Sequence, residues 1–221
     1  MIPPVLAKAS GLVLDIGPGT GTQLPLLCSP AIKAIYGPEP CVGLHAELAA
    51  KIHTYGLDSK YHILPNSVEA SELLPAMKRE GLVPVSGATA TTTPDGMRIP
   101  EGGIFDTILC VRVLCSVPNP EKVISELYSF LKPRGKLLVI EHVVNPWRTA
   151  KGSVVARAAQ SVYQALGWSV FLGDCCLNRD TEKMLRNAAV KDGGWEVVEL
   201  DRWFGKTVLP YISGVLVKKQ N

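Results

Sequence analysis

A glycine-rich loop has the clearest chemistry in this sequence of 221 residues. The loop, DIGPGTG at 15–21, directly follows the apolar run LVLDI and contains three glycines, Gly17, Gly19 and Gly21. Glycines at the end of a strand let the backbone approach a ligand closely. A dinucleotide site needs Gly or Ala where Thr22 stands, and the chain has no GxxxxGK motif followed by Ser or Thr for triphosphates. These two ligand classes are therefore disfavoured.

Two acids flank the glycine loop. Asp15 begins it, and Glu39 follows the next apolar run, IKAIY. An acid at the end of the second strand can bind both hydroxyls of a ribose. Asp15 is placed to hold a cationic amino group, directly or through water. A ligand with adenosine, a ribose and an amino acid cation matches S-adenosylmethionine. The alternative is that Asp15 caps the loop and Glu39 is a solvated turn acid.

A second pair of chemical groups, Glu141 and His142, is expected at the end of the fifth strand, in the apolar run KLLVIEHVV at 136–144. A thiol or hydroxyl that accepts a methyl group must lose its proton, and a base can take it. The carboxyl edge of such a sheet is where ligands bind. We therefore take His142 as the candidate general base and Glu141 as its orienter or as a loop anchor. The alternative is a structural pair hydrogen-bonded to nearby backbone.

Residues 145–178 are expected to form the wall of an acceptor pocket. Helical spacing puts six apolar residues on one face, which we expect to be core: Val154, Val155, Ala158, Val162, Ala165 and Leu166. Five further residues flank that face and could enclose an apolar acceptor: Trp147, Tyr163, Trp168, Phe171 and Asp174. Adjacent Cys175 and Cys176 chelate one ion poorly, and no partner follows at ligand spacing, so we expect no metal. Arg112 is either part of a buried ion pair or an anchor for a carboxylate.

Seven apolar runs predict the strands that position these groups: 12–16, 32–36, 61–64, 105–113, 136–144, 195–200 and 211–218. Helix-like stretches lie between them at 43–55, 67–80, 120–132, 152–166 and 180–190. Continuous apolar runs indicate a parallel sheet covered on both faces. The last connection is too short for a crossover helix. The pattern predicts a doubly wound, Rossmann-like α/β fold whose seven-stranded, mostly parallel sheet has an antiparallel last strand.

Local signals define two segments more closely. The 120–132 helix has Asn119 as its cap and Pro120 in its first turn, and we expect Pro133 and Gly135 to stop it. Residues 81–103 are rich in Gly, Pro and Thr without helical periodicity. We expect a long loop or insert there.

Composition limits the classes of function. The chain is 47% hydrophobic with a net charge of +3, which indicates a globular domain and no nucleic-acid partner. Its six cysteines form no CxxC pair, which favours a reduced, cytoplasmic protein. The longest apolar run is broken by Arg112, and no signal peptide pattern begins the chain, so we expect no membrane span.

The glycine loop with YGPEP (36–40) resembles motif I and the following acid of class I S-adenosylmethionine-dependent methyltransferases. The similarity is closer to the methyltransferase-like-seven group, which methylates thiols, at VLCSV (113–117) and GDCCLNRDT (173–181). It covers about residues 10–218. The resemblance implies one class I methyltransferase domain over 1–221 that uses S-adenosylmethionine to methylate a small, largely apolar molecule at sulfur or, as second choice, oxygen.

The resemblance also nominates further cofactor contacts. NSVEA (66–70) matches the stretch that contacts adenine, which implies roles for Val68 and Glu69. Cys110 and Val111, at the end of the fourth strand, would line the methionine portion. For Val68, Cys110 and Val111 the alternative is ordinary core.

Alternative functions on the same fold are a non-methylating isomerase or cyclase and a non-catalytic subunit of a methyltransferase assembly. Only about ten residues precede the first strand, so we expect a cofactor site partly open in a monomer. Residues 81–103, the acceptor or the second subunit of a homodimer could close it.

Overall fold

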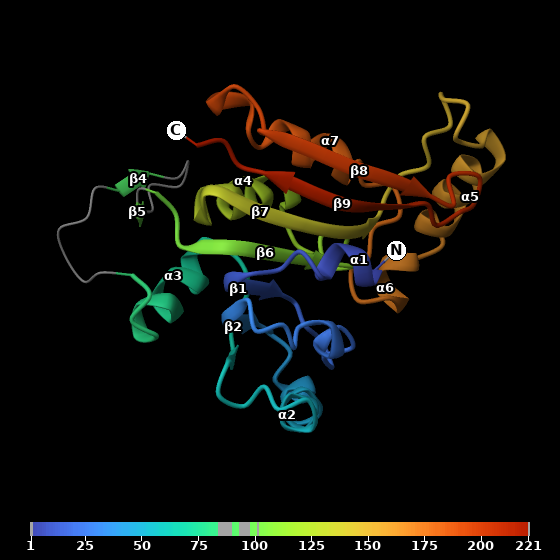
Figure 1. Ribbon diagram of the computed structural model, residues 1–221. Coiled ribbons are helices and arrows are strands. Elements are labelled where there is room, and N and C mark those ends of the chain that lie inside the picture. Colours follow the sequence, from blue (N-terminus) through green and yellow to red (C-terminus); the bar gives the residue numbers. More distant parts are fainter. Residues whose placement is uncertain (1, 84–89, 93–97, 101, 221) are drawn as a thin grey trace.

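Seven strands form one sheet in the computed structural model, which describes residues 2–83, 90–92, 98–100 and 102–220 (Figure 1). The strands are β1 Gly11–Ile16, β2 Ile32–Pro38, β3 Tyr61–Leu64, β6 Phe105–Val111, β7 Leu131–His142, β8 Val197–Trp203 and β9 Tyr211–Val217. Their order is β3-β2-β1-β6-β7-β9-β8; β9 pairs antiparallel with both β7 and β8, and the other pairs of this sheet are parallel. The predicted mixed sheet with a reversed last strand is confirmed.

Helices cover both faces of this sheet. They are α1 Ile2–Leu6, α2 His45–Thr54, α3 Ala70–Arg79, α4 Pro120–Phe130, α5 Val154–Ala165, α6 Trp168–Phe171 and α7 Thr181–Asn187, with short 3₁₀ turns at Leu24–Leu26, Val42–Leu44 and Val190–Asp192. Side chains of α3, α4 and α7 share one buried apolar cluster with the sheet, and those of α1 and α2 share the other. This is the expected doubly wound arrangement. Figure 1 shows α5 and α6 beyond the carboxyl ends of β6 and β7.

The ends of β6 and of α4 differ from the sequence prediction for identifiable reasons. β6 ends at Val111, because Arg112 has a positive φ of 56° and turns the chain. α4 ends at Phe130, and β7 already begins at Leu131, which pairs with Phe105. The prediction that Pro133 and Gly135 stop the helix is therefore wrong, since both residues lie within β7.

The start of α4 also corrects a prediction. Asn119 occupies the N-cap position with a left-handed φ of 36°, but its side chain makes no capping hydrogen bond. Pro120 is the first helical residue, as expected. The helix thus begins through the fixed φ of Pro120 rather than through a side-chain cap.

The apolar face of α5 is exposed, and the prediction that it is core is wrong. Val155 and Leu166 are 79% and 72% exposed, and the other four residues of the predicted face are exposed as well. The buried residues of the helix are Ala156 and Gln160. The Gln160 amide is satisfied there, because it accepts from the Asn145 N–H and donates to three backbone carbonyls. A hydrogen-bonded polar residue, not the apolar stripe, attaches α5 to the domain.

Part of the 81–103 segment lies outside the described residues, namely 84–89, 93–97 and 101. Its described strands, β4 Ala90–Thr92 and β5 Arg98–Pro100, pair antiparallel as a separate two-stranded sheet. Ile99 is fully buried in the larger apolar cluster. No described helix has the length and apolar character needed to cross a membrane.

Candidate active site

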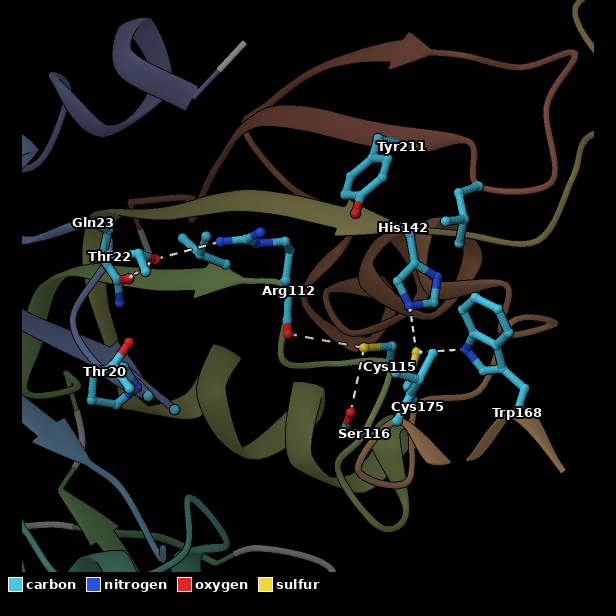
Figure 2. A pocket seen from close by; sticks show the side chains of 16 residues that line it. Thr20, Thr22, Gln23, Arg112, Cys115, Ser116, His142, Trp168, Cys175 and Tyr211 are labelled. Atoms are coloured by element: carbon cyan, nitrogen blue, oxygen red, sulfur yellow. Dashed lines mark hydrogen bonds between the residues drawn. The ribbon is translucent and has the colours of Figure 1, made fainter. Parts of the chain in front are cut away.

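One cavity of about 510 Å³ opens at the carboxyl ends of β1, β6 and β7 (Figure 2). Part of its wall is the glycine loop, and the opposite part is built around His142. Its lining residues are Gly17, Pro18, Gly19, Thr20, Thr22, Gln23, Val111, Arg112, Cys115, Ser116, His142, Trp168, Leu172, Cys175, Leu209 and Tyr211. The structure therefore brings the two chemically distinct parts of the sequence to one space.

The three loop glycines have different surroundings. All have positive φ, between 57° and 75°. A Cβ at Gly17 would lie 2.6 Å from Val113, and one at Gly21 would lie 2.7 Å from Leu24, so both positions are filled by packing. A Cβ at Gly19 would meet nothing within 4 Å. The loop thus leaves open space at Gly19, as a backbone that cradles a ligand requires.

Glu39 is buried, with 6% exposure, and holds this loop against the end of β2. One carboxylate oxygen accepts from the Gly19 N–H at 2.9 Å, and the other accepts from the Cys41 N–H at 2.9 Å. The alternative of a solvated turn acid does not describe it. Each oxygen retains further acceptor capacity, which is what a ribose hydroxyl needs.

Asp15 has no exposed surface and lies behind the loop. It accepts hydrogen bonds from the Tyr61 hydroxyl at 2.8 Å and from the Gln23 amide at 3.1 Å. Burial raises the pKa of Asp15 to about 6, although the bonds from Tyr61 and Gln23 lower it in part. Asp15 therefore positions Gln23, and Gln23 in turn lines the cavity. The sequence carried no signal for Gln23.

The remaining predicted cofactor residues lie in different places. Val111 lines the cavity, whereas Val68, Glu69 and Cys110 do not. Cys110 is fully buried, Val68 is 7% exposed, and both belong to the larger apolar cluster. Glu69 is half-buried immediately before α3. Their proposed contacts with a cofactor stay predictions.

Arg112 is exposed at the cavity, so the alternative of a buried ion pair is wrong. Its guanidinium donates to the Thr22 hydroxyl at 3.4 Å, so the side chain reaches from the end of β6 to the segment after the glycine loop (Figure 2). The left-handed backbone at this residue turns the chain into the cavity wall. A cation in this position suits a ligand carboxylate.

His142, the last residue of β7, has its Nε2 atom 3.0 Å from the Sγ atom of Cys175. Cys175 also accepts from the Trp168 indole N–H at 3.4 Å. Hydrogen bonds from Cys115, His142 and Trp168 lower the pKa of Cys175 well below its ordinary value. The His142 Nδ1 atom is buried without a hydrogen-bond partner among the described residues. The imidazole is thus paired with a thiol rather than oriented by a carboxylate.

Glu141 faces away from His142, since neighbouring strand residues point to opposite sides of a sheet. It is fully buried, and one oxygen accepts from the N–H groups of Val113 and Leu114 at 2.9 and 3.0 Å. Burial raises the pKa of Glu141 to about 7, and these backbone bonds oppose the shift. Of its two expected roles, the geometry matches the loop anchor.

The expected acceptor wall is only partly present. Trp168 lines the cavity. The centroid of the Tyr163 ring lies 6.0 Å from that of the Trp168 ring, but Tyr163 does not line the cavity. Trp147 and Phe171 are 40% and 82% exposed and lie outside the lining, as does Asp174. Further apolar lining comes from Leu172, which lies within the predicted 145–178 wall but was not singled out, and from Leu209 and Tyr211, which lie outside that segment.

The fold is that of S-adenosylmethionine-dependent methyltransferases. An O-methyltransferase family protein from Burkholderia thailandensis superimposes with a TM-score of 0.61 at 14% identity, over 98% of this chain and 53% of that one. The cyclase SpnF also gives a TM-score of 0.61 at 14% identity, over 100% of this chain and 81% of its own. At such identities the likeness establishes the fold alone.

Sequence comparison establishes the family. A methyltransferase domain model matches residues 2–200, and the chain belongs to this class I, S-adenosylmethionine-dependent family. Human thiol S-methyltransferase TMT1B is 35% identical over 130 residues, which are 56% of this chain and 48% of that protein. Human thiol S-methyltransferase TMT1A is 28% identical over 120 residues. The chain spans about half the length of these relatives. The predicted family and cofactor are confirmed.

Proposed function

We propose that the chain transfers a methyl group from S-adenosylmethionine to the sulfur of a small, largely apolar thiol. The observation that carries this proposal is the continuous cavity that joins the open space at Gly19 to His142. Similarity to the thiol S-methyltransferases supports sulfur as the acceptor atom. Free cysteines at the site suit the reducing, cytoplasmic setting expected from composition.

The glycine-loop end of the cavity is the proposed cofactor seat. Gly19 leaves room for the bound molecule, and Glu39 behind it offers oxygens to ribose hydroxyls. Gln23, held by Asp15, faces the amino acid portion, and Arg112 supplies a cation for its carboxylate. When bound, S-adenosylmethionine would supply a methyl carbon on a positively charged sulfur. Transfer forms a bond between the acceptor sulfur and the methyl carbon, breaks the bond between that carbon and the sulfonium sulfur, and leaves S-adenosylhomocysteine.

The His142 end is the proposed acceptor seat. Leu172, Leu209 and Tyr211 line it and would exclude water from an apolar acceptor. His142 is the proposed proton acceptor, in the tautomer that carries its hydrogen on Nδ1: Nε2 exchanges its contact with Cys175 for the acceptor thiol and takes the thiol proton, and the freed sulfur lone pair attacks the methyl carbon. Thiols need the least assistance, because their ordinary pKa is near 8.5. Glu141 keeps the 113–114 turn in place beside this seat.

The test is methyl transfer from labelled S-adenosylmethionine to a panel of thiols, phenols and carboxylic acids. We expect S-methyl products from apolar thiols, with one S-adenosylhomocysteine formed per product. Methylation of phenols alone would contradict the assignment to sulfur. Binding of S-adenosylmethionine without transfer to any acceptor would favour a cyclase-like or non-catalytic role, which the structural likeness to a cyclase keeps as the second candidate.

A further inference from the structure

Cys115, His142 and Cys175 form a cluster at the acceptor end of the cavity. Each offers one ligand atom, and these atoms lie within 4.8 Å of one another. In a tetrahedral zinc site, bond lengths of about 2.3 Å to sulfur and 2.0–2.1 Å to nitrogen place ligand atoms roughly 3.5–3.8 Å apart. The cluster needs only small side-chain movements to reach that geometry.

The three residues come from three separate segments that the fold fixes together. Cys115 lies in the turn after β6, His142 ends β7, and Cys175 follows α6. The Cys176 N–H donates to the Cys115 carbonyl at 2.9 Å, which joins two of these segments beside the sulfurs. Arg179 donates to the Leu114 and Val117 carbonyls at 2.7 Å and joins them again. These hydrogen bonds hold the segment of Cys175 against the turn that carries Cys115.

The chemistry of the donors selects a soft divalent ion. Two thiolates and one neutral imidazole around Zn²⁺ sum to zero charge, which lowers the cost of burying the group. Cys115 and His142 are only 4% and 5% exposed. The Trp168 indole N–H, which donates to the Cys175 sulfur, is an outer contact of the kind that orients metal ligands (Figure 2).

A three-ligand site in a cavity wall keeps one coordination position open. All three residues line the cavity that reaches Gly19, so the open position faces the proposed acceptor seat. Zinc sites with three protein ligands and an open position are catalytic rather than structural.

We propose that Cys115, His142 and Cys175 bind one Zn²⁺ ion, which takes the acceptor thiol as its fourth ligand. This rests on the proposed function and adds a metal-loaded form in which His142 is a ligand rather than the base. The acceptor sulfur binds the metal, and its proton leaves to solvent through the open cavity. After transfer the product is a neutral thioether, which is a weaker ligand than a thiolate and dissociates.

The metal site can be tested without cofactor or acceptor. Protein freed of metal by a chelator, under a phosphine reductant, is titrated with Co²⁺ as a spectroscopic probe. We expect one equivalent to bind, with thiolate-to-cobalt charge-transfer absorption that Zn²⁺ abolishes. Cys115→Ser and Cys175→Ser should each weaken cobalt binding by at least about 100-fold. Removing a residue that only hydrogen-bonds to a metal ligand already lowers metal affinity about 10–100-fold, and these variants remove a ligand itself.

Cys176→Ser is the matched control, because its sulfur points to the Asp174 carbonyl and lies outside the cluster. It should retain the cobalt absorption. Loss of absorption in Cys176→Ser equal to that in Cys115→Ser, or no cobalt thiolate band in the parent protein, would overturn the site. If a variant does not fold, alkylation of the parent protein gives the answer: Zn²⁺ should protect Cys115 and Cys175 but not exposed Cys41. Equal alkylation with and without Zn²⁺ refutes the proposal.

Acceptor chemistry separates this proposal from the proposed function. A thiol should perturb the cobalt spectrum without S-adenosylmethionine present, whereas a phenol of similar shape should not. A bound metal with no methyl transfer to any thiol would refute the proposed function and leave the site. Equal transfer rates in metal-free and zinc-loaded protein, or a cobalt spectrum unchanged by thiols, would refute the role of the metal.

Discussion

The two ends of the cavity are built in opposite ways. The cofactor end comes mainly from one short stretch, residues 15–23, which Glu39 joins from the end of β2 and Arg112 from the end of β6. The acceptor end is assembled from segments far apart in the sequence, at Cys115, His142 and Cys175. A local sequence motif can therefore reveal the first end by itself. The second end exists only after the sheet and its loops have formed.

Gly19→Arg should have the largest effect, because it fills the open space at the cofactor end. We expect binding of S-adenosylmethionine to fall below detection in calorimetry. Gly56→Arg is the matched control, since Gly56 has a similar φ of 63° and also faces open space, but lies outside the cavity lining. Retained binding in Gly19→Arg, or equal loss in Gly56→Arg, would place the cofactor elsewhere.

His142→Ala tests the acceptor end and should leave cofactor affinity nearly unchanged. In metal-free protein we expect the rate with neutral thiols to fall roughly 10²-fold at pH 7, because the proton acceptor is gone. The loss should shrink toward pH 9, where thiolate already forms. His53→Ala, at an exposed residue outside the cavity, serves as control. An unaltered rate across pH 6 to 9 would return His142 to a structural role.

Asp15→Asn tests the burial of the Asp15 carboxyl behind the cofactor end through the pH dependence of the free energy of unfolding. Since the folded-state pKa of Asp15 is raised from 3.8 to about 6, its buried carboxyl favours the folded protein when protonated. The parent protein should lose stability relative to the variant as pH rises from about 4 to about 6, by up to roughly 3 kcal/mol. Urea unfolding of both proteins at several pH values measures this. A difference that does not change with pH contradicts the assigned burial.

The smallest effects concern α5, which lies outside the cavity lining. Val155→Ser should change the free energy of unfolding by less than about 0.5 kcal/mol, because Val155 is exposed. Gln160→Leu on the same helix should cost about 1–3 kcal/mol, since it leaves the Asn145 N–H and three carbonyls unpaired. Thermal or urea unfolding compares the two. A larger cost for Val155→Ser would mean that the apolar face is buried.

The sequence predicts the sheet and the glycine loop well, because both depend on contiguous patterns. Apolar runs locate all seven strands of the main sheet, and the short last connection predicts the reversed strand. The α5 face was mispredicted because apolar spacing shows that a stripe exists but not which neighbour covers it. Gln160 is buried only because carbonyls from three other segments converge on it.

The sequence points to several residues of the candidate site but not to which of them lie in contact with one another. His142 and Cys175 are 33 residues apart, and Cys115 is remote from both, so no ligand spacing could join them. Gln23 likewise reaches the cavity through a bond to Asp15 that only the folded loop creates. By contrast, Glu39 was predicted from its place at the end of a strand, which the topology alone determines.

The most direct test of this cavity as the place of methyl transfer is a crystal structure with S-adenosylhomocysteine and an apolar thiol bound together. We expect the ribose to lie near Glu39 and the homocysteine sulfur to point along the cavity toward His142. The thiol sulfur should lie between the homocysteine sulfur and the cluster of Cys115, His142 and Cys175. A cofactor whose sulfur faces away from His142, or a thiol bound outside this cavity, would contradict this expectation.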